Sequence, residues 1–213
     1  MLGETRRYHH GDLRTALVEA GLRLARSGGA DALGLRGVTR SVGVTPNAAY
    51  RHFADRQALV LAVAVEAQGL LARAMLDRIG VIEPDAEPGE QALERLRAVG
   101  LGYIHFALSE PGWFELAILT KDEPGEEAAS VRIADAVPPP YQLLLDVLNG
   151  LVEAGVLSPE RRAHAEWACW SAVHGFADLV TRGPLHGQDR DVIDKLAAHV
   201  VDTIIAGIRA GAD

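Results

Sequence analysis

The sequence has one cysteine and few aromatic residues, since Phe, Trp and Tyr together make up 5% of its 213 residues. Cys169 alone cannot build an internal disulfide framework, and such cysteine usage is typical of proteins in a reducing cytosol. The segment from Met1 to Asp12 lacks an apolar run, and no later run approaches the roughly 20 residues of a membrane span. We therefore expect a cytoplasmic protein with no signal peptide and no membrane partner.

Motifs of common enzymes and metal sites are also missing. The sequence has no G-x-S-x-G elbow and no H-E-x-x-H pair, and "GLG" at 100 to 102 falls inside an expected helix instead of a phosphate loop. The eight histidines are scattered without metal-ligand spacing. We predict no catalytic site, no cofactor and no metal, and a buried, inert Cys169. A small all-α enzyme using His174 and Asp178 stays open as an alternative.

Helical periodicity dominates what is present. No window shows a sustained period of two, and 48% of the residues are apolar, mostly small or aliphatic. Apolar spacing, caps and Pro or Gly breaks predict an all-α fold of about nine helices. Their expected ranges are 12–28, 35–42, 46–53, 55–80, 90–109, 111–121, 138–155, 160–182 and 189–209.

Charge is distributed unevenly along the chain. Residues 1–60 carry nine arginines and five acidic residues, whereas the other 153 residues carry 12 basic and 24 acidic groups. A basic end can meet a polyanion while the acidic body stays beyond the roughly 8 Å screening length. The asymmetry predicts two modules with different partners, which we place at residues 1–54 and 55–213.

The segment "GVTPNAAYRHF", residues 43–53, is polar although it lies in an apolar-rich chain. A helix ending at Gly43, a short turn and a second helix opened by Thr45 and Pro46 have the layout of a helix-turn-helix. Val44, Ala49 and Phe53 are expected to face inward. The outer face then consists of side chains that can reach base edges or phosphates: Thr45, Pro46, Asn47, Tyr50, Arg51 and His52.

Several arginines surround this short helix in the sequence. Arg36 and Arg40 lie one turn apart on the preceding helix, Arg56 opens the following one, and Arg6 and Arg7 form a possible flexible arm. Arginine is suited to phosphate contacts, so these positions favour double-stranded DNA as the partner.

The segment "GVTPNAAYRHFADRQAL" resembles the recognition region of the TetR family of transcriptional regulators. The segments "YHHGDLRTAL" (8–17) and "WACWSAVHGFADL" (167–179) resemble a subgroup with a Trp-x-x-x-His-Gly signature. The resemblance implies three DNA-binding helices followed by a ligand-binding and dimerisation domain. It further implies that Tyr50 and His52 contact phosphate or base edges, that Arg56 clamps a phosphate, and that residues 45–47 face the bases.

Most aromatic residues lie beyond residue 100, and Trp170 and His174 share one helix face. Aromatic and aliphatic groups with a few polar atoms are typical of a small-molecule site. We expect an effector pocket lined by Tyr103, Phe106, Trp113, Trp170 and His174. Two alternatives stay open: these aromatics form plain core, or His174 and Gly175 mark a dimer contact.

The last two expected helices carry apolar stripes such as Ile193, Leu196, Val200 and Ile204. Paired around a two-fold axis, they would form a four-helix bundle and a homodimer. The sequence thus predicts a dimeric regulator, most simply a repressor released from a near-palindromic operator by a small-molecule effector, with the long fourth helix as the coupling element. A constitutive DNA-binding or interaction module is the other alternative.

Overall fold

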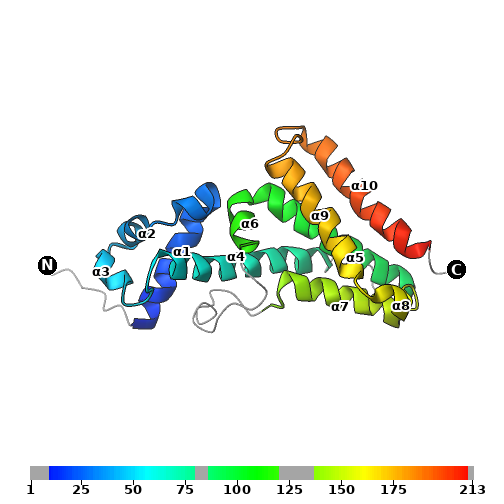
Figure 1. The fold of residues 1–213 in the computed structure, drawn as a ribbon, viewed down its shortest axis with the longest axis horizontal. Coiled ribbons are helices and arrows are strands. Elements are labelled where there is room, and N and C mark those ends of the chain that lie inside the picture. The colour runs from blue at the N-terminus through cyan, green and yellow to red at the C-terminus, as the bar shows by residue number, and fades with distance from the viewer. Residues whose placement is uncertain (1–9, 80–85, 120–136, 211–213) are drawn as a thin grey trace. The chain divides into compact units, whose positions relative to one another are not determined.

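Every regular element of the computed structural model is helical within the residues it describes, which are 10–79, 86–119 and 137–210 (Figure 1). The predicted all-α fold is confirmed. The short 3₁₀ helix η1 covers Gly29–Ala32. The α-helices are α1 (His10–Gly28), α2 (Leu35–Val42), α3 (Pro46–Ala49), α4 (Arg56–Ile79), α5 (Pro88–Ser109), α6 (Pro111–Ala117), α7 (Pro140–Glu153), α8 (Pro159–Arg162), α9 (Ala165–Thr181) and α10 (Arg190–Arg209).

Two expected helices end earlier than the sequence pattern indicates, and a third is divided. The helix expected at 111–121 ends at Ala117. The helix expected at 46–53 stops at Ala49, and the chain continues in turns in which His52 N and Phe53 N both donate to the Ala49 carbonyl. The helix expected at 160–182 is divided into α8 and α9 because His164 has a φ of 63°, which no α-helix interior accommodates. Arg162 stabilises the chain at this break, since its guanidinium donates to the side chains of Asn149 and Glu166.

The described part of the chain divides into two compact units. Residues within 1–68 and 112–136 form the first unit, and residues within 69–111 and 137–213 form the second. Helix α4 therefore contributes to both units, and α6 belongs to the unit that holds α1 to α3. The predicted arm arginines, Arg6 and Arg7, lie outside the described residues.

The first unit has a tightly buried core beneath α1, α2 and α3. Leu17, Val38, Ala49 and Leu59 are fully buried, and Phe53 is 1% exposed. Each fully buried large aliphatic or aromatic side chain contributes roughly 1.5 to 3 kcal/mol of transfer free energy. This core fixes the orientation of the short α3, which is too short to be stable alone.

The second unit packs α5 against α7, α9 and α10, with α9 and α10 side by side (Figure 1). One apolar cluster joins α5, α7, α9 and the end of α10 around Leu148 and Leu151, and another joins α5, α9 and α10 around Ile104 and Ala197. Pro residues at the first turn start α5 and α7, where the missing N–H costs nothing.

Helix α4 is long and apolar enough to cross a membrane by length and composition, which differs from the expectation that no segment approaches this limit. Of the apolar stretch of α4 that meets this criterion, 56% is buried inside the protein. A buried core helix satisfies the same criterion, because its apolar face is covered by protein.

Candidate DNA interface and ligand cavity

The turn between α2 and α3 depends on Gly43, which caps α2 in the left-handed conformation with φ of 77°. Gly43 N donates to the Arg40 carbonyl and Val44 N to the Thr39 carbonyl, so the last carbonyls of α2 are satisfied. A side chain at position 43 would have open space, and the requirement for glycine is therefore conformational. Thr45 occupies the N-cap position of α3 with Pro46 following it, as predicted, although no side-chain capping bond forms.

The short helix buries one side and exposes the other. Ala49 and Phe53 face the core and Val44 is half-buried, in agreement with the predicted inward set. Tyr50 is 54% exposed, a large value for an aromatic side chain, and His52 is half-buried. The remaining predicted outer residues are all exposed: Thr45, Pro46, Asn47 and Arg51.

Arg36 and Arg40 are both exposed on α2, one helical turn apart. Between them, Thr39 is buried and its hydroxyl donates to the Leu35 carbonyl. Both guanidinium groups lie on the polar side of α2, within the same unit as α3. Arg51, which follows Tyr50 in the chain, is a third exposed arginine of this unit.

Arg56 makes contacts that the sequence did not indicate. Its Nε donates to the Leu33 carbonyl at 2.9 Å and its Nη2 donates to the Ala30 carbonyl at 2.6 Å. The guanidinium thus joins the start of α4 to the segment around η1. Two of its five N–H donors point into the protein, whereas the resemblance assigned this side chain to a phosphate. Asp55 caps the start of α4, since its carboxylate accepts from Ala58 N at 2.8 Å.

Arg14 is a positioning residue that the sequence did not indicate. From α1, its Nη1 donates to the His52 carbonyl, and its guanidinium carbon lies 4.4 Å from the centre of the Phe53 ring. The cationic group therefore holds the chain just after α3 by a charge-assisted hydrogen bond and a cation–π contact. No short motif marks this role, because the partner is a backbone carbonyl 38 residues away.

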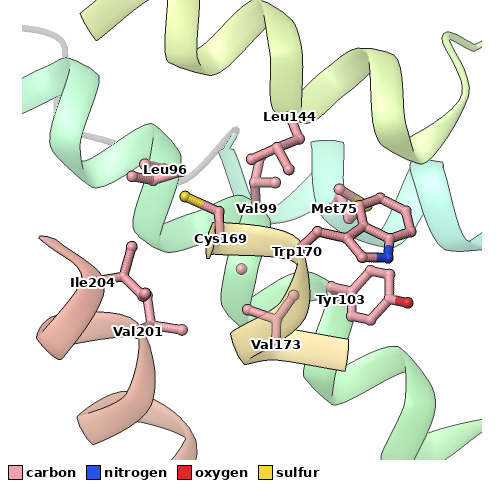
Figure 2. A pocket seen from close by; sticks show the side chains of 11 residues that line it. Met75, Leu96, Val99, Tyr103, Leu144, Cys169, Trp170, Val173, Val201 and Ile204 are labelled. Atoms are coloured by element: carbon pink, nitrogen blue, oxygen red, sulfur yellow. The ribbon is translucent and has the colours of Figure 1, made fainter. Parts of the chain in front are cut away.

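The second unit contains a cavity between α4, α5, α7, α9 and α10 (Figure 2). Its volume is about 30 Å³, and Figure 2 shows the Tyr103 and Trp170 rings next to each other at one side of it. The lining is aliphatic apart from these rings, a thiol and a thioether. It comprises Met75, Leu96, Val99, Gly100, Tyr103, Leu144, Cys169, Trp170, Val173, Val201 and Ile204.

Tyr103 connects this cavity to His174. The Tyr103 hydroxyl and His174 Nδ1 are 2.8 Å apart, and the Tyr103 and Trp170 rings meet edge to face at 5.4 Å. Tyr103 is 1% exposed, and burial raises the pKa of its hydroxyl far above its usual range. The phenol therefore stays protonated, and its oxygen and the histidine nitrogen form a polar pair beside an apolar space.

The structure brings together only part of the predicted pocket. Tyr103 and Trp170 line the cavity and His174 adjoins it through Tyr103. Phe106 is buried on α5 but does not line the cavity. Trp113 belongs to the first unit, where its indole N–H donates to the Leu22 carbonyl at 2.8 Å. Helical periodicity could not tell the aromatic residues that line the cavity from those that do not. It shows which residues share a face of a helix, but not which other helix packs against that face.

The remaining chemical candidates have structural partners. Asp178 accepts from Arg182 Nε at 2.9 Å, so its carboxylate pairs along α9 while His174 pairs with Tyr103. Cys169 is buried, and desolvation raises the pKa of its thiol to about 11. No group of three or more His, Cys, Asp or Glu side chains suited to a metal occurs among the described residues.

Helices α9 and α10 leave apolar side chains exposed to solvent. Leu179 is 45% exposed on α9, and Val192 and Leu196 are 45% and 37% exposed on α10. Gly175 is also exposed, and a side chain there would meet open space.

Comparison with known proteins agrees with this two-part arrangement. Residues 17–63 match the family model "Bacterial regulatory proteins, tetR family", and residues 96–204, more than half of the chain, match "Tetracyclin repressor-like, C-terminal domain". A relative in Bacillus subtilis (strain 168), the uncharacterized HTH-type transcriptional regulator YobS, is 24% identical over 192 residues, covering 90% of each chain.

Solved structures share the fold along nearly the whole chain. A protein of unknown function from Rhodococcus sp. RHA1 is 27% identical with a TM-score of 0.71, covering 95% of this chain and 98% of its own. A TetR variant from Acinetobacter baumannii AYE, solved with minocycline, has a TM-score of 0.59 at 18% identity, covering 97% and 99%. This likeness concerns the fold alone.

The exposed polar face of α3, the basic groups around it and the two family matches agree on one class of protein. Membership of the Trp-x-x-x-His-Gly subgroup stays a prediction. The chain belongs to the TetR family and is a DNA-binding transcriptional regulator, not an enzyme.

Proposed function

We propose that this regulator is a cytoplasmic homodimeric repressor that leaves a near-palindromic operator when a small molecule occupies the cavity of the second unit. The observation that carries the proposal is the division of α3 into a buried side and an exposed polar side, with Tyr50 54% exposed. DNA offers phosphates and base edges that the side chains of this exposed polar side can contact.

In this proposal, residues of α3 and its C-terminal turn read the operator. Asn47 can form hydrogen bonds with adenine in the major groove, while Thr45 and Pro46 contact the base edges. Tyr50, Arg51 and His52 reach phosphates or base edges, and Arg36 and Arg40 add phosphate contacts from α2. The free donors of Arg56 can contact a phosphate while the others hold the backbone around η1. Residues 1–54 are the DNA-binding domain, and residues 55–213 bind the effector and dimerise.

The exposed apolar residues of α9 and α10 support a dimer through these two helices. A two-fold axis would bring Leu179, Val192 and Leu196 onto their copies and remove them from water. Exposed Gly175 would let two α9 helices approach closely, in keeping with the dimer-contact alternative for this position. Such a dimer presents two recognition helices to half-sites one or more DNA turns apart.

Two connections within the chain favour coupling between the sites. Helix α4 contributes residues to both units, and α6 follows α5 directly but packs in the first unit through Trp113 and the Leu22 carbonyl. A ligand that changes the packing of α5 can therefore act on α1 through α6, as well as along α4. If the ligand weakens DNA binding by some factor, DNA weakens ligand binding by the same factor.

The experiment begins with selection of bound duplexes from random DNA by the full-length protein. We expect an enriched near-palindrome bound by two chains, measured by native mass spectrometry. Leu196→Glu should give monomers with weak operator binding, whereas Lys195→Glu, a larger charge change at the neighbouring exposed position, should leave the dimer intact. An enriched site without two-fold symmetry, or a dimeric Leu196→Glu variant with unchanged affinity, would contradict the dimer assignment.

A further inference from the structure

The cavity of the second unit restricts what kind of molecule it can hold. No charged side chain lines it among the described residues, and the polar groups of its lining side chains are the Tyr103 hydroxyl, the Trp170 indole N–H and the Cys169 thiol. Tyr103 already has a hydrogen-bonding partner in His174. A carboxylate or ammonium group placed here would lose its hydration without gaining a countercharge, which strongly disfavours its binding. The lining therefore selects against ions.

The size of the cavity sets a second restriction. At about 30 Å³ it has room for roughly two water-sized spheres, whereas an apolar cavity of about 150 Å³ holds a benzene molecule. A ring can enter only if a side chain moves. Trp170 is the side chain best placed to do so, because it is half-buried and its ring is held by edge contacts to Tyr103 at 5.4 Å and Tyr141 at 5.7 Å.

We propose that the effector is an uncharged, apolar molecule about the size of a single aromatic ring, which enters by displacing the Trp170 indole and occupies the space between Leu144, Val173 and Val201 (Figure 2). This inference rests on the proposed function, in which the cavity is the effector site. Trp170 lies on α9, one of the two proposed dimer helices, so its displacement changes the packing of the element that sets the spacing of the half-sites.

Gly100 provides a way to fill the cavity from its wall. A Cβ at this position would lie 3.2 Å from Val201 Cγ2 and 3.5 Å from Val173 Cγ1, so the methyl group fits after a small shift of a valine. Gly150 on α7 offers a matched control, because a Cβ there has no neighbour within 4 Å. Each Gly→Ala change should favour its helix to a similar extent, and only Gly100→Ala removes space from the cavity.

The test uses toluene and benzoate as probes, since they share a ring and differ in charge. Isothermal titration of the full-length protein should show toluene binding to the wild-type and Gly150→Ala proteins, at least tenfold weaker binding to Gly100→Ala, and no binding of benzoate. Toluene should also change the tryptophan fluorescence, and Trp170→Phe should abolish most of that change. Thermal unfolding of each variant confirms that it is folded.

Three results would overturn the inference: no toluene binding up to its solubility limit, tighter binding of benzoate than of toluene, or equal toluene binding by Gly100→Ala and Gly150→Ala. The proposed function is judged separately, by operator affinity in the presence of each probe. Toluene binding that leaves operator affinity unchanged supports the ligand class and contradicts effector-driven release. Release by benzoate and not by toluene supports effector control and overturns the ligand class.

Discussion

Replacing Arg14 with methionine isolates the contact that orients the C-terminal end of the recognition element. Methionine keeps the aliphatic stem and removes the guanidinium, which donates to the His52 carbonyl and lies 4.4 Å from the centre of the Phe53 ring. Arg14 is partly buried, so these interactions are only partly screened by solvent. The perturbation therefore acts on the first unit without changing any residue assigned to the DNA-facing side.

The magnitude follows from the two lost contacts. A hydrogen bond from a charged donor contributes about 1.5 to 3 kcal/mol, and a cation–π contact about 0.5 to 1 kcal/mol. Their sum, about 2 to 4 kcal/mol, is a large part of the stability of a unit this small. In native-state hydrogen exchange, protection of the α1 and α2 amides should fall by about 30- to 700-fold, because each 1.4 kcal/mol is a factor of ten.

Arg23→Met is the matched control, because Arg23 is exposed on the same helix. We expect Arg14→Met to weaken operator binding together with amide protection, and Arg23→Met to leave the protection of α1 and α2 unchanged. Equal loss of protection in both variants would refute the assigned contact. Weaker DNA binding by Arg14→Met with full protection would mean that Arg14 touches DNA itself and is not a positioning residue.

Three further outcomes follow from packing and protonation. Gly112→Ala should lower the free energy of unfolding in urea by at least about 3 kcal/mol, because its Cβ would overlap backbone carbonyl oxygens of α1, whereas Gly69→Ala, with open space, should raise it by about 0.5 to 1 kcal/mol. Burial, with the positive charge of Arg78, lowers the pKa of His105, so the folded state binds fewer protons than the unfolded chain. The free energy of unfolding should therefore fall as the pH drops below about 6.5. His105→Gln should reduce this loss of stability in pH-dependent unfolding, and an undiminished loss would contradict the role of His105. With a thiol pKa of about 11, native Cys169 should react with iodoacetamide far more slowly at pH 8 than the unfolded chain does, and equal rates would contradict its burial.

The network around His105 explains its response to acid. His105 Nδ1 lies 2.9 Å from Arg78 Nη1, and its Nε2 lies 3.2 Å from the Asp194 carboxylate, which also pairs with Arg190. A neutral imidazole can accept from Arg78 and donate to Asp194. Protonation places a second N–H against the guanidinium, and this repulsion together with burial outweighs the attraction of Asp194.

The sequence predicted the helices well where local chemistry determines their ends. Gly43 ends α2 because the left-handed cap needs a residue without Cβ, and Asp55 caps α4 through its carboxylate. The break at His164 was missed because no Gly or Pro marks it. Its position depends on Arg162 bridging Asn149 and Glu166, a tertiary arrangement that helical periodicity does not encode.

The candidate sites show the same limit. Which side chains of α3 are exposed depends only on this helix and its caps, so a short segment of sequence was enough to predict them. The cavity depends on how several helices meet, and its aliphatic walls, such as Leu144 and Val173, look in the sequence like any core stripe. Trp113 was assigned to the cavity with the other aromatics, although its indole anchors α6 to the Leu22 carbonyl of α1.

The most direct test of the central claim, that α2 and α3 present a DNA-binding face, is the salt dependence of affinity for the selected duplex. Several arginine–phosphate contacts predict a steep linear loss of log affinity with log salt, and Arg40→Gln should reduce the slope by about 0.9. Arg95→Gln, the same charge change at an exposed position on α5, should leave the slope unchanged. A shallow slope, or equal effects of the two variants, would contradict the account.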